Sequence, residues 1–168
     1  ENESVDLPEM FRLAVASGRG IGKSALVSWI ILWMLSTRLG ATIIVTANTE
    51  QQLRTRTWAE LGKWLTLSIH SHWFSKTATA IKPAQWFEKS LIEDLKIDTG
   101  YYYAQAQLWS EENPDAFAGI HSSYGVCLIM DEASGIPAPI YSVSEGFFSE
   151  PTKNRYWFTF SNPRRNSA

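Results

Sequence analysis

Short apolar runs alternate with longer helical patterns along the first part of the chain. Residues 11–16 (FRLAVA) form a short apolar run, which predicts a buried strand. Residues 23–37 are apolar nearly all round, which predicts a helix that is buried on several sides. Arg38 and Gly40 give the usual signal for the end of that helix. The β-branched run 42–46 (TIIVT) then predicts a second buried strand.

A second helix is predicted directly after this strand. Thr49 is a suitable N-cap residue, and Gln52 follows it at the spacing of a capping box. The next residues place apolar side chains at intervals of mostly three and four, which is the stripe of an amphipathic helix. The members of that stripe are Leu53, Trp58, Leu61, Trp64 and Leu65.

The pattern is weaker between residues 68 and 108. Trp86 with Phe87, and the segment 101–106, alternate enough to predict short strands. The tripeptide at 113–115 (NPD) predicts a turn. This middle part of the chain therefore contributes short elements and loops rather than long helices.

Two strands and one helix are predicted in the last third of the chain. The apolar run 126–130 (VCLIM) predicts a buried strand, 140–148 a helix, and 155–160 (RYWFTF) a last aromatic strand. Strands and helices that alternate in this way predict an α/β domain with a mainly parallel sheet. In such sheets, ligands bind beyond the carboxyl ends of the strands.

Composition and charge exclude several classes of protein. The 168 residues have the length of one domain, and a chain with 45% hydrophobic and 19% charged residues is not disordered. The single cysteine, Cys127, excludes an internal disulfide and a cysteine-rich metal site. The formal net charge of −2 excludes a bulk polyanion binder, so any contact with nucleic acid must come from a local patch or an oligomer.

No targeting or membrane segment is expected. The first residues are acidic and polar, unlike the start of a signal peptide. The longest apolar run, 25–35, is shorter than the roughly 20 residues that a membrane span needs. A location in the cytosol is therefore the expectation.

The strongest motif joins the first predicted strand to the first predicted helix. Residues 17–24 (SGRGIGKS) fit the phosphate-binding pattern G-x-x-x-x-G-K-[ST], with Ser17 at the first glycine position. Its glycines allow backbone N–H groups to turn toward a polyanion. Lys23 is expected at the β- and γ-phosphates of ATP, and the Ser24 hydroxyl on Mg²⁺. The residues expected to bind the nucleotide are Ser17, Gly18, Arg19, Gly20, Ile21, Gly22, Lys23 and Ser24.

Polar side chains also follow the last two predicted strands. Asp131 and Glu132 come directly after 126–130. In a phosphate-loop enzyme, the first acid holds the metal and the second activates the attacking water. Ser161 and Asn162 follow 155–160, where they could contact the γ-phosphate or the water.

Arg19 lies inside the phosphate loop. A guanidinium at this place can stabilise charge in the transition state, as an arginine finger does. An exposed arginine, or one paired with an acid, is the alternative interpretation. Arg19 is therefore predicted as a catalytic residue together with Lys23 and Glu132.

In these residues the chain resembles the ATPase domain of the large terminase subunit of tailed bacteriophages. The resemblance extends over about residues 11–165 and implies a P-loop NTPase fold of the additional-strand, catalytic-glutamate (RecA-like) type. The segments that carry it are SGRGIGKS (17–24), TANTEQQLRTRTW (46–58), NPDAFAGIHS (113–122), LIMDEASGIP (128–137) and TFSNPRRN (159–166).

The resemblance implies a Mg²⁺-dependent, DNA-stimulated ATPase that moves double-stranded viral DNA into a procapsid. It assigns Asp131 to the metal, Glu132 to the catalytic base, and Ser161 with Asn162 to the element that couples hydrolysis to DNA movement. It leaves open whether the arginine finger acts within one subunit or between neighbours. The implied partners are double-stranded DNA, the portal protein, the small terminase subunit and further copies in a ring, without a membrane, in the cytoplasm of a bacterial host. Family members also carry a C-terminal nuclease domain, which is not expected within the single domain 1–168.

Three other functions remain possible at this point. A helicase or another nucleic-acid-dependent NTPase shares the phosphate loop and the acid pair, although a helicase needs a second RecA-like domain. A small-molecule kinase needs a lid and no glutamate after the aspartate. An inactive P-loop scaffold is disfavoured by the intact Lys23, Ser24, Asp131 and Glu132.

Overall fold

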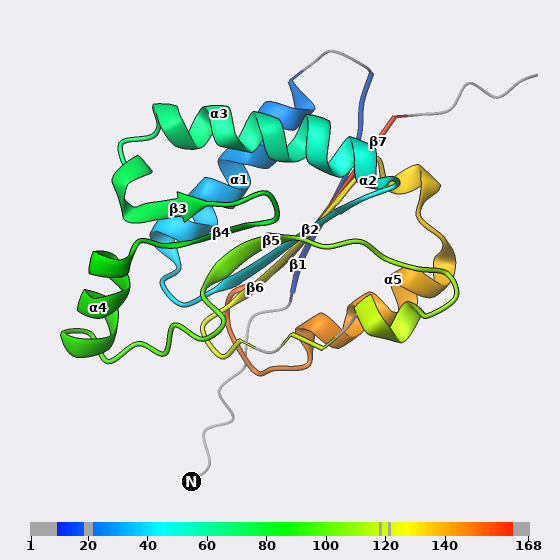
Figure 1. The fold of residues 1–168 in the computed structure, drawn as a ribbon. Coiled ribbons are helices and arrows are strands. Elements are labelled where there is room, and N and C mark those ends of the chain that lie inside the picture. The colour runs from blue at the N-terminus through cyan, green and yellow to red at the C-terminus, as the bar shows by residue number, and fades with distance from the viewer. Residues whose placement is uncertain (1–9, 19–21, 118, 121, 163–168) are drawn as a thin grey trace, which may run out of the picture.

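The chain forms one sheet with helices on both faces (Figure 1). The computed structural model describes residues 10–18, 22–117, 119–120 and 122–162. Within them the strands are β1 (Phe11–Ala16), β2 (Thr42–Ala47), β3 (Phe74–Lys76), β4 (Ala80–Pro83), β5 (Tyr103–Ala106), β6 (Val126–Asp131) and β7 (Arg155–Ser161). The α- and π-helical segments are α1 (Lys23–Thr37), α2 (Glu50–Gln52), the π-helix η1 (Leu53–Trp58), α3 (Ala59–Leu67), α4 (Gln85–Glu93) and α5 (Ala138–Ser144). Short 3₁₀ turns lie at Ser71–Trp73, Pro114–Phe117, Ala133–Gly135 and Glu145–Phe148.

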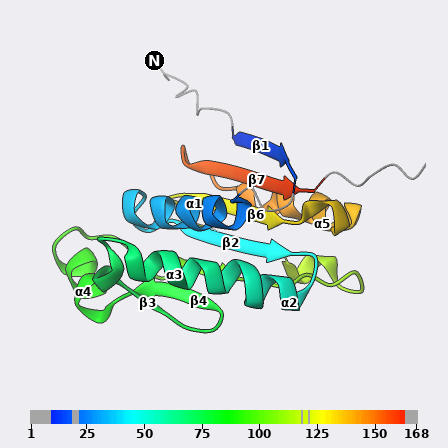
Figure 2. The ribbon, with the colours of Figure 1, turned by 90° about the horizontal axis from the view of Figure 1, so that it is seen from above.

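The sheet is mainly parallel, as predicted. Its strand order is β1-β7-β6-β2-β5-β4-β3, and the neighbours from β1 to β5 run parallel to one another. Among the described strands, the antiparallel pairs are β5 with β4 and β4 with β3, at one edge of the sheet. Strand β7 lies between β1 and β6, so an additional strand separates the phosphate-loop strand from the strand of the acid pair (Figure 2). The predicted RecA-like type of P-loop fold is therefore confirmed.

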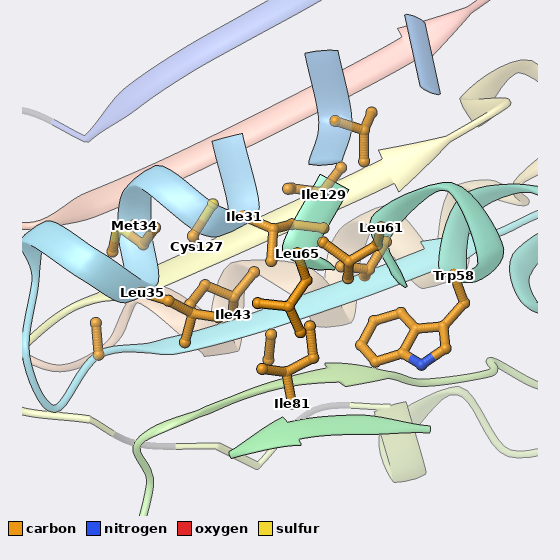
Figure 3. Packing of buried hydrophobic residues seen from close by; sticks show 14 of the residues in the cluster. Ile31, Met34, Leu35, Ile43, Trp58, Leu61, Leu65, Ile81, Cys127 and Ile129 are labelled. Atoms are coloured by element: carbon orange, nitrogen blue, oxygen red, sulfur yellow. The ribbon is translucent and has the colours of Figure 1, made fainter. Parts of the chain in front are cut away.

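Successive side chains of the central strands point to opposite faces of the sheet, and this produces two hydrophobic layers, one on each face. Ile43 and Val45 of β2 point to the layer under α1 and α3, whereas Ile44 points to the layer under α5. Cys127 and Ile129 of β6 belong to the first layer, which Figure 3 shows. Since side chains alternate with a period of two, a strand that is apolar at every position fills both layers.

Most predicted elements are confirmed, with small changes at their ends. The helix at 23–37 and the strand at 11–16 have the predicted bounds, and Thr49 is the N-cap of α2. The strand at 11–16 is not buried as predicted, because β1 is an edge strand of the sheet and its Phe11 and Leu13 are exposed. The predicted helix 140–148 begins two residues earlier and changes to a 3₁₀ turn at Glu145. The predicted strand at 101–106 is shorter, at Tyr103–Ala106.

The prediction of a strand at Trp86 and Phe87 is wrong, because both residues lie in α4. Phe87 packs against Trp73 with ring centroids 5.1 Å apart, and Leu91, four residues further along α4, is fully buried. This is helical spacing, which two aromatic residues alone do not distinguish from a strand. The β3–β4 hairpin, which precedes α4, was not predicted either.

Helix α1 is not buried on several sides, contrary to the prediction. Ile31 and Met34 face the core, but Trp29 is 50% and Trp33 39% exposed. The sheet and α3 cover only part of its circumference (Figure 2). The exposed side is partly shielded by an edge-on contact between Trp29 and Trp64, 5.1 Å between ring centroids. No helix in the described residues is long and apolar enough to cross a membrane.

The turn between α1 and β2 generates a prediction about stability. Gly40 has φ of 86°, and a Cβ there would lie 2.7 Å from the ring of Tyr124. Gly40→Ala is expected to lower the free energy of unfolding by at least about 1–2 kcal/mol, because it adds a steric clash to a left-handed backbone. Urea unfolding at equilibrium measures the change.

Gly62→Ala is the matched control for this prediction. Gly62 lies inside α3, and the nearest atom to a new Cβ is Cε of the flexible Lys76 side chain, at 3.1 Å. Alanine is favoured over glycine by about 0.5–1 kcal/mol inside a helix, so this variant should be no less stable than the parent. Equal unfolding midpoints for the two variants would contradict the argument.

Candidate functional site

The carboxyl ends of β1, β7 and β6 meet at one edge of the sheet. Because these neighbouring strands are parallel, the polar residues that follow them converge. The backbone N–H of Ser17 donates to the carbonyl of Ser161 at 3.1 Å, so the β1–β7 ladder continues one residue beyond Ala16. The phosphate-loop segment and the Ser161–Asn162 segment therefore start side by side.

Helix α1 begins at this edge. Gly22 is its N-cap residue, with φ of 86° and ψ of 17°, a left-handed conformation that suits glycine. Lys23 and Ser24 form the first turn of the helix, where free backbone N–H groups and the helix dipole favour an anion. Residues 19–21, Arg19, Gly20 and Ile21 among the predicted nucleotide contacts, lie outside the described residues.

A pocket of about 390 Å³ lies in front of these strand ends. The side-chain ammonium of Lys23 donates to Oδ1 of Asn162, which joins the first turn of α1 to the end of β7. The pocket brings together five of the predicted site residues. Its lining consists of Lys23, Ser24, Asp131, Glu132 and Asn162, together with Gln52 and Arg56.

Asp131 is the buried acid of the pocket, with only 8% of its surface exposed. Its Oδ2 accepts a hydrogen bond from the Thr57 hydroxyl at 2.8 Å, and its Oδ1 accepts one from the backbone N–H of Glu132 at 3.0 Å. A buried carboxylate needs such donors, because desolvation penalises the charged form. Each oxygen keeps a lone pair for a further ligand.

Glu132 has an unusual backbone conformation, with φ of 53° and ψ of 45°. For a residue with a side chain, this left-handed conformation costs about 1–2 kcal/mol. Its Oε2 accepts a hydrogen bond from Nε2 of Gln52 at 2.6 Å, and Nη1 of Arg56 lies 3.5 Å from its Oε1. The neighbouring carboxylates of Asp131 and Glu132 thus have separate donors.

The turn that follows Glu132 is anchored by Tyr141. The Tyr141 hydroxyl donates to the carbonyl of Ala133 at 2.9 Å. Burial raises the pKa of Tyr141, which further favours the neutral phenol that donates this bond. The 3₁₀ turn Ala133–Gly135, which follows Glu132, is therefore fixed to α5.

Three residues of the site were missed by the sequence argument: Gln52, Arg56 and Thr57. All three lie on the helical segment that follows β2. The predicted cap is present, since the N–H of Gln52 donates to the Thr49 hydroxyl at 3.2 Å, but the side chain of Gln52 turns to Glu132 instead of completing the capping box. The π-helix that carries Arg56 and Thr57 has no simple sequence signature.

Some predicted site residues lie near the pocket without lining it. Ser17 and Gly18 directly follow β1, and Ser161 is the last residue of β7. Two basic residues of the helical segments after β2 are paired with acids, Arg54 with Glu50 at 2.8 Å and Lys63 with Glu60 at 4.0 Å. These cations are therefore partly neutralised by their own helix.

The fold places the chain in the class of RecA-like P-loop domains. The family model described as "RNA cytidine acetyltransferase NAT10/TcmA, helicase domain" matches residues 14–145. Because this match spans most of the chain, the chain belongs to that family of helicase-type domains.

A curated relative and several solved structures are phage large terminases. The chain is 28% identical to the "Probable terminase, large subunit" of Enterobacteria phage P7, over 90% of this chain and 31% of the relative. The chain thus spans about a third of that relative. The large terminase ATPase domain of Thermus phage P74-26 matches with a TM-score of 0.58 and 19% identity, over 91% of this chain and 59% of the other.

The large terminase of the thermophilic bacteriophage D6E, solved in complex with ADP, matches with a TM-score of 0.60 and 14% identity, over 90% of this chain and 33% of the other. At these identities the structural matches show the fold. Together with the curated relative, they confirm the resemblance to terminase ATPase domains that the motifs predicted.

The contact between Thr57 and Asp131 generates a prediction. Thr57→Val keeps the shape of the side chain but leaves Oδ2 of Asp131 buried without its donor. The free energy of unfolding should fall by about 1–3 kcal/mol, the usual cost of an unsatisfied buried group. Chemical denaturation monitored by tryptophan fluorescence gives the value.

Thr55→Val is the control, because Thr55 is exposed on the same π-helix and its hydroxyl donates to the carbonyl of Gln51. This change should cost at most about 0.5 kcal/mol, as exposed substitutions usually do. If both variants unfold at the same denaturant concentration, the hydroxyl of Thr57 does not stabilise Asp131.

Proposed function

We propose that the chain is a Mg²⁺-dependent ATPase domain that powers the movement of double-stranded viral DNA into a procapsid, as part of a large terminase subunit. The observation that carries the proposal is the pocket in which Lys23, Asp131 and Glu132 meet at one edge of the sheet. The relatives named as terminases support the biological setting. The ADP complex of one of them supports a nucleotide as the ligand.

The start of α1 suits the phosphates of ATP. Lys23 supplies a point charge for the β- and γ-phosphates, and the N–H groups of the first turn supply donors. In the structure the ammonium of Lys23 is held by Asn162. A γ-phosphate would compete with Asn162 for Lys23, which gives β7 a direct way to respond to the nucleotide. Ser161 and Asn162 are proposed as the coupling element for this reason.

The oxygens near Lys23 fit Mg²⁺. Ser24 and Asp131 line the pocket and offer a hydroxyl and a carboxylate, which are hard oxygen ligands. Among the described residues no group of three or more His, Cys, Asp and Glu could hold a metal. This agrees with Mg²⁺, which takes one or two protein oxygens and completes its shell with phosphates and water. When bound, Mg²⁺ neutralises charge on the phosphates.

Glu132 is proposed as the general base. Its carboxylate lines the same pocket as Lys23, and would take a proton from the water that attacks the γ-phosphate. Its donors, Gln52 and Arg56, occupy one position at each oxygen and leave further lone pairs free. Arg19 is proposed to stabilise the charge of the transition state, either in its own subunit or across a ring.

The partners and the location follow from the same proposal. Double-stranded DNA, the portal protein, the small terminase subunit and neighbouring copies would surround the domain in the cytoplasm of the bacterial host. The net charge of −2 and the paired cations Arg54 and Lys63 argue against a broad basic surface on one copy. DNA would therefore be held by a ring rather than by a single domain.

The family model favours a second candidate function, a helicase-type nucleic-acid-dependent NTPase. Both candidates hydrolyse ATP in response to nucleic acid. They differ in the product, since a helicase separates the strands of a duplex and a packaging motor moves the duplex intact. A strand-separation assay with a fluorescently labelled, partly single-stranded duplex distinguishes them.

The first functional prediction is that the protein hydrolyses ATP with Mg²⁺ and that duplex DNA stimulates the rate. Lys23→Ala should lower turnover by at least about tenfold and weaken nucleotide binding, because the phosphates lose their point charge. Phosphate release is measured with and without DNA over a range of protein concentrations. A variant rate within about threefold of the parent contradicts the phosphate-site assignment.

The second functional prediction separates the two acids. Glu132→Gln should keep ATP and Mg²⁺ bound but slow hydrolysis by at least about 10²-fold, the usual loss for a general base. Asp131→Asn should instead raise the Mg²⁺ concentration needed for half-maximal activity. Hydrolysis across a Mg²⁺ titration compares them, and identical titration curves would show that the roles are not separate.

A further inference from the structure

We propose that Gln52 is a positioning residue that fixes the carboxylate of Glu132 for hydrolysis, an inference that rests on the proposed ATPase function. Gln52 reaches this carboxylate from a helix on the far side of β2, 80 residues away in the sequence. The contact is short, 2.6 Å from Nε2 to Oε2. Nothing in the capping-box pattern of Gln52 requires it.

The π-helix explains why two donors of the same segment reach the two acids. Gln52 donates to Glu132, and Thr57, five residues later, donates to Asp131 at 2.8 Å. In an α-helix, residues five apart are rotated by about 140° from each other. In a π-helix the turn closes between residues i and i+5, which brings both side chains to the same face. The π-turn at Leu53–Trp58 therefore directs this segment at both carboxylates.

The orientation of the Gln52 amide is determined by its partner. An ionised carboxylate only accepts hydrogen bonds, so the NH₂ group must face Glu132. This leaves Oε1 of Gln52 buried, and it has no hydrogen-bond partner in the described part of the chain. A half-satisfied buried amide does not favour the folded state. The placement is therefore better explained by what it does to Glu132 than by stability.

Glu132 needs such a fixed donor more than Asp131 does. Its side chain has one more rotatable bond, is not fully buried, and starts from a strained left-handed backbone. Arg56, the other group at this carboxylate, lies 3.5 Å away with a side chain that is 68% exposed, so it holds Glu132 weakly. Without Gln52 the base would sample several rotamers, and alignment with the attacking water would be lost.

The test compares Gln52→Met with Gln51→Met in the whole protein. Methionine keeps the length and volume of the side chain but removes both amide groups. Gln51 is the exposed neighbour on α2 and serves as the matched control. The measurements are kcat and KM for ATP, the affinity for a fluorescent ADP, the affinity for ADP with aluminium fluoride, and the thermal midpoint. Gln52→Glu is a second variant, which keeps an oxygen but replaces the donor with a like charge.

The expected result is a loss that is confined to the chemical step. In Gln52→Met and Gln52→Glu, kcat should fall at least tenfold, and the affinity for ADP with aluminium fluoride should fall in parallel. KM and the affinity for ADP alone should stay within about twofold, and the thermal midpoint of Gln52→Met should be equal to that of the parent or higher. Gln51→Met should match the parent in every measurement.

Four results would overturn the inference. A kcat of Gln52→Met within threefold of the parent means that Gln52 does not position Glu132, and a higher kcat means that it restrains Glu132 instead. A lower kcat that accompanies a lower thermal midpoint and weaker ADP binding means a structural role. If the parent binds ADP but does not hydrolyse ATP, the proposed function itself fails, and this inference fails with it.

Discussion

The site depends on one constraint, the parallel placement of β7 between β1 and β6. It brings three chain segments that are far apart in the sequence to the same edge of the sheet. The ladder continues past β1 through the 3.1 Å bond between Ser17 and Ser161. Because the strand ends are locked together, the first turn of α1 starts beside the end of β7, and Lys23 can reach Asn162. The pocket is a consequence of this register.

Hydrogen-bond donors from neighbouring residues hold the two acids at the end of β6. Charged carboxylates are costly to bury, so each needs nearby donors. The donors to Asp131 are the Thr57 hydroxyl and the backbone N–H of Glu132. The donors to Glu132 are the side chains of Gln52 and Arg56. The donating side chains come from one helical segment beyond β2, whose π-turn faces β6. The strained backbone of Glu132 lies directly before the 3₁₀ turn that Tyr141 fixes to α5.

The terminase structures share the fold of this chain although most of their side chains differ from it. A terminase ATPase domain with 19% identity still matches 91% of the chain. A buried parallel sheet needs apolar residues at alternating positions rather than particular ones, so the fold persists while most side chains change. Function depends on fewer positions, which is why the packaging role is proposed from the pocket and the named relatives rather than from the fold.

The sequence by itself determined the α/β class, the main strands and helices, and the residues Lys23, Ser24, Asp131, Glu132 and Asn162 that later line one pocket. These follow from local patterns: apolar runs, a glycine-rich turn, and polar residues at strand ends. The tertiary structure alone decided the strand order, the antiparallel β3–β4 edge, the helix at Trp86 and the exposure of Trp29. It also decided that Gln52 and Thr57 reach the acids. Such contacts join residues more than 70 positions apart through a π-turn, and neither distance in space nor this rare helix geometry is encoded in the pattern of neighbouring residues.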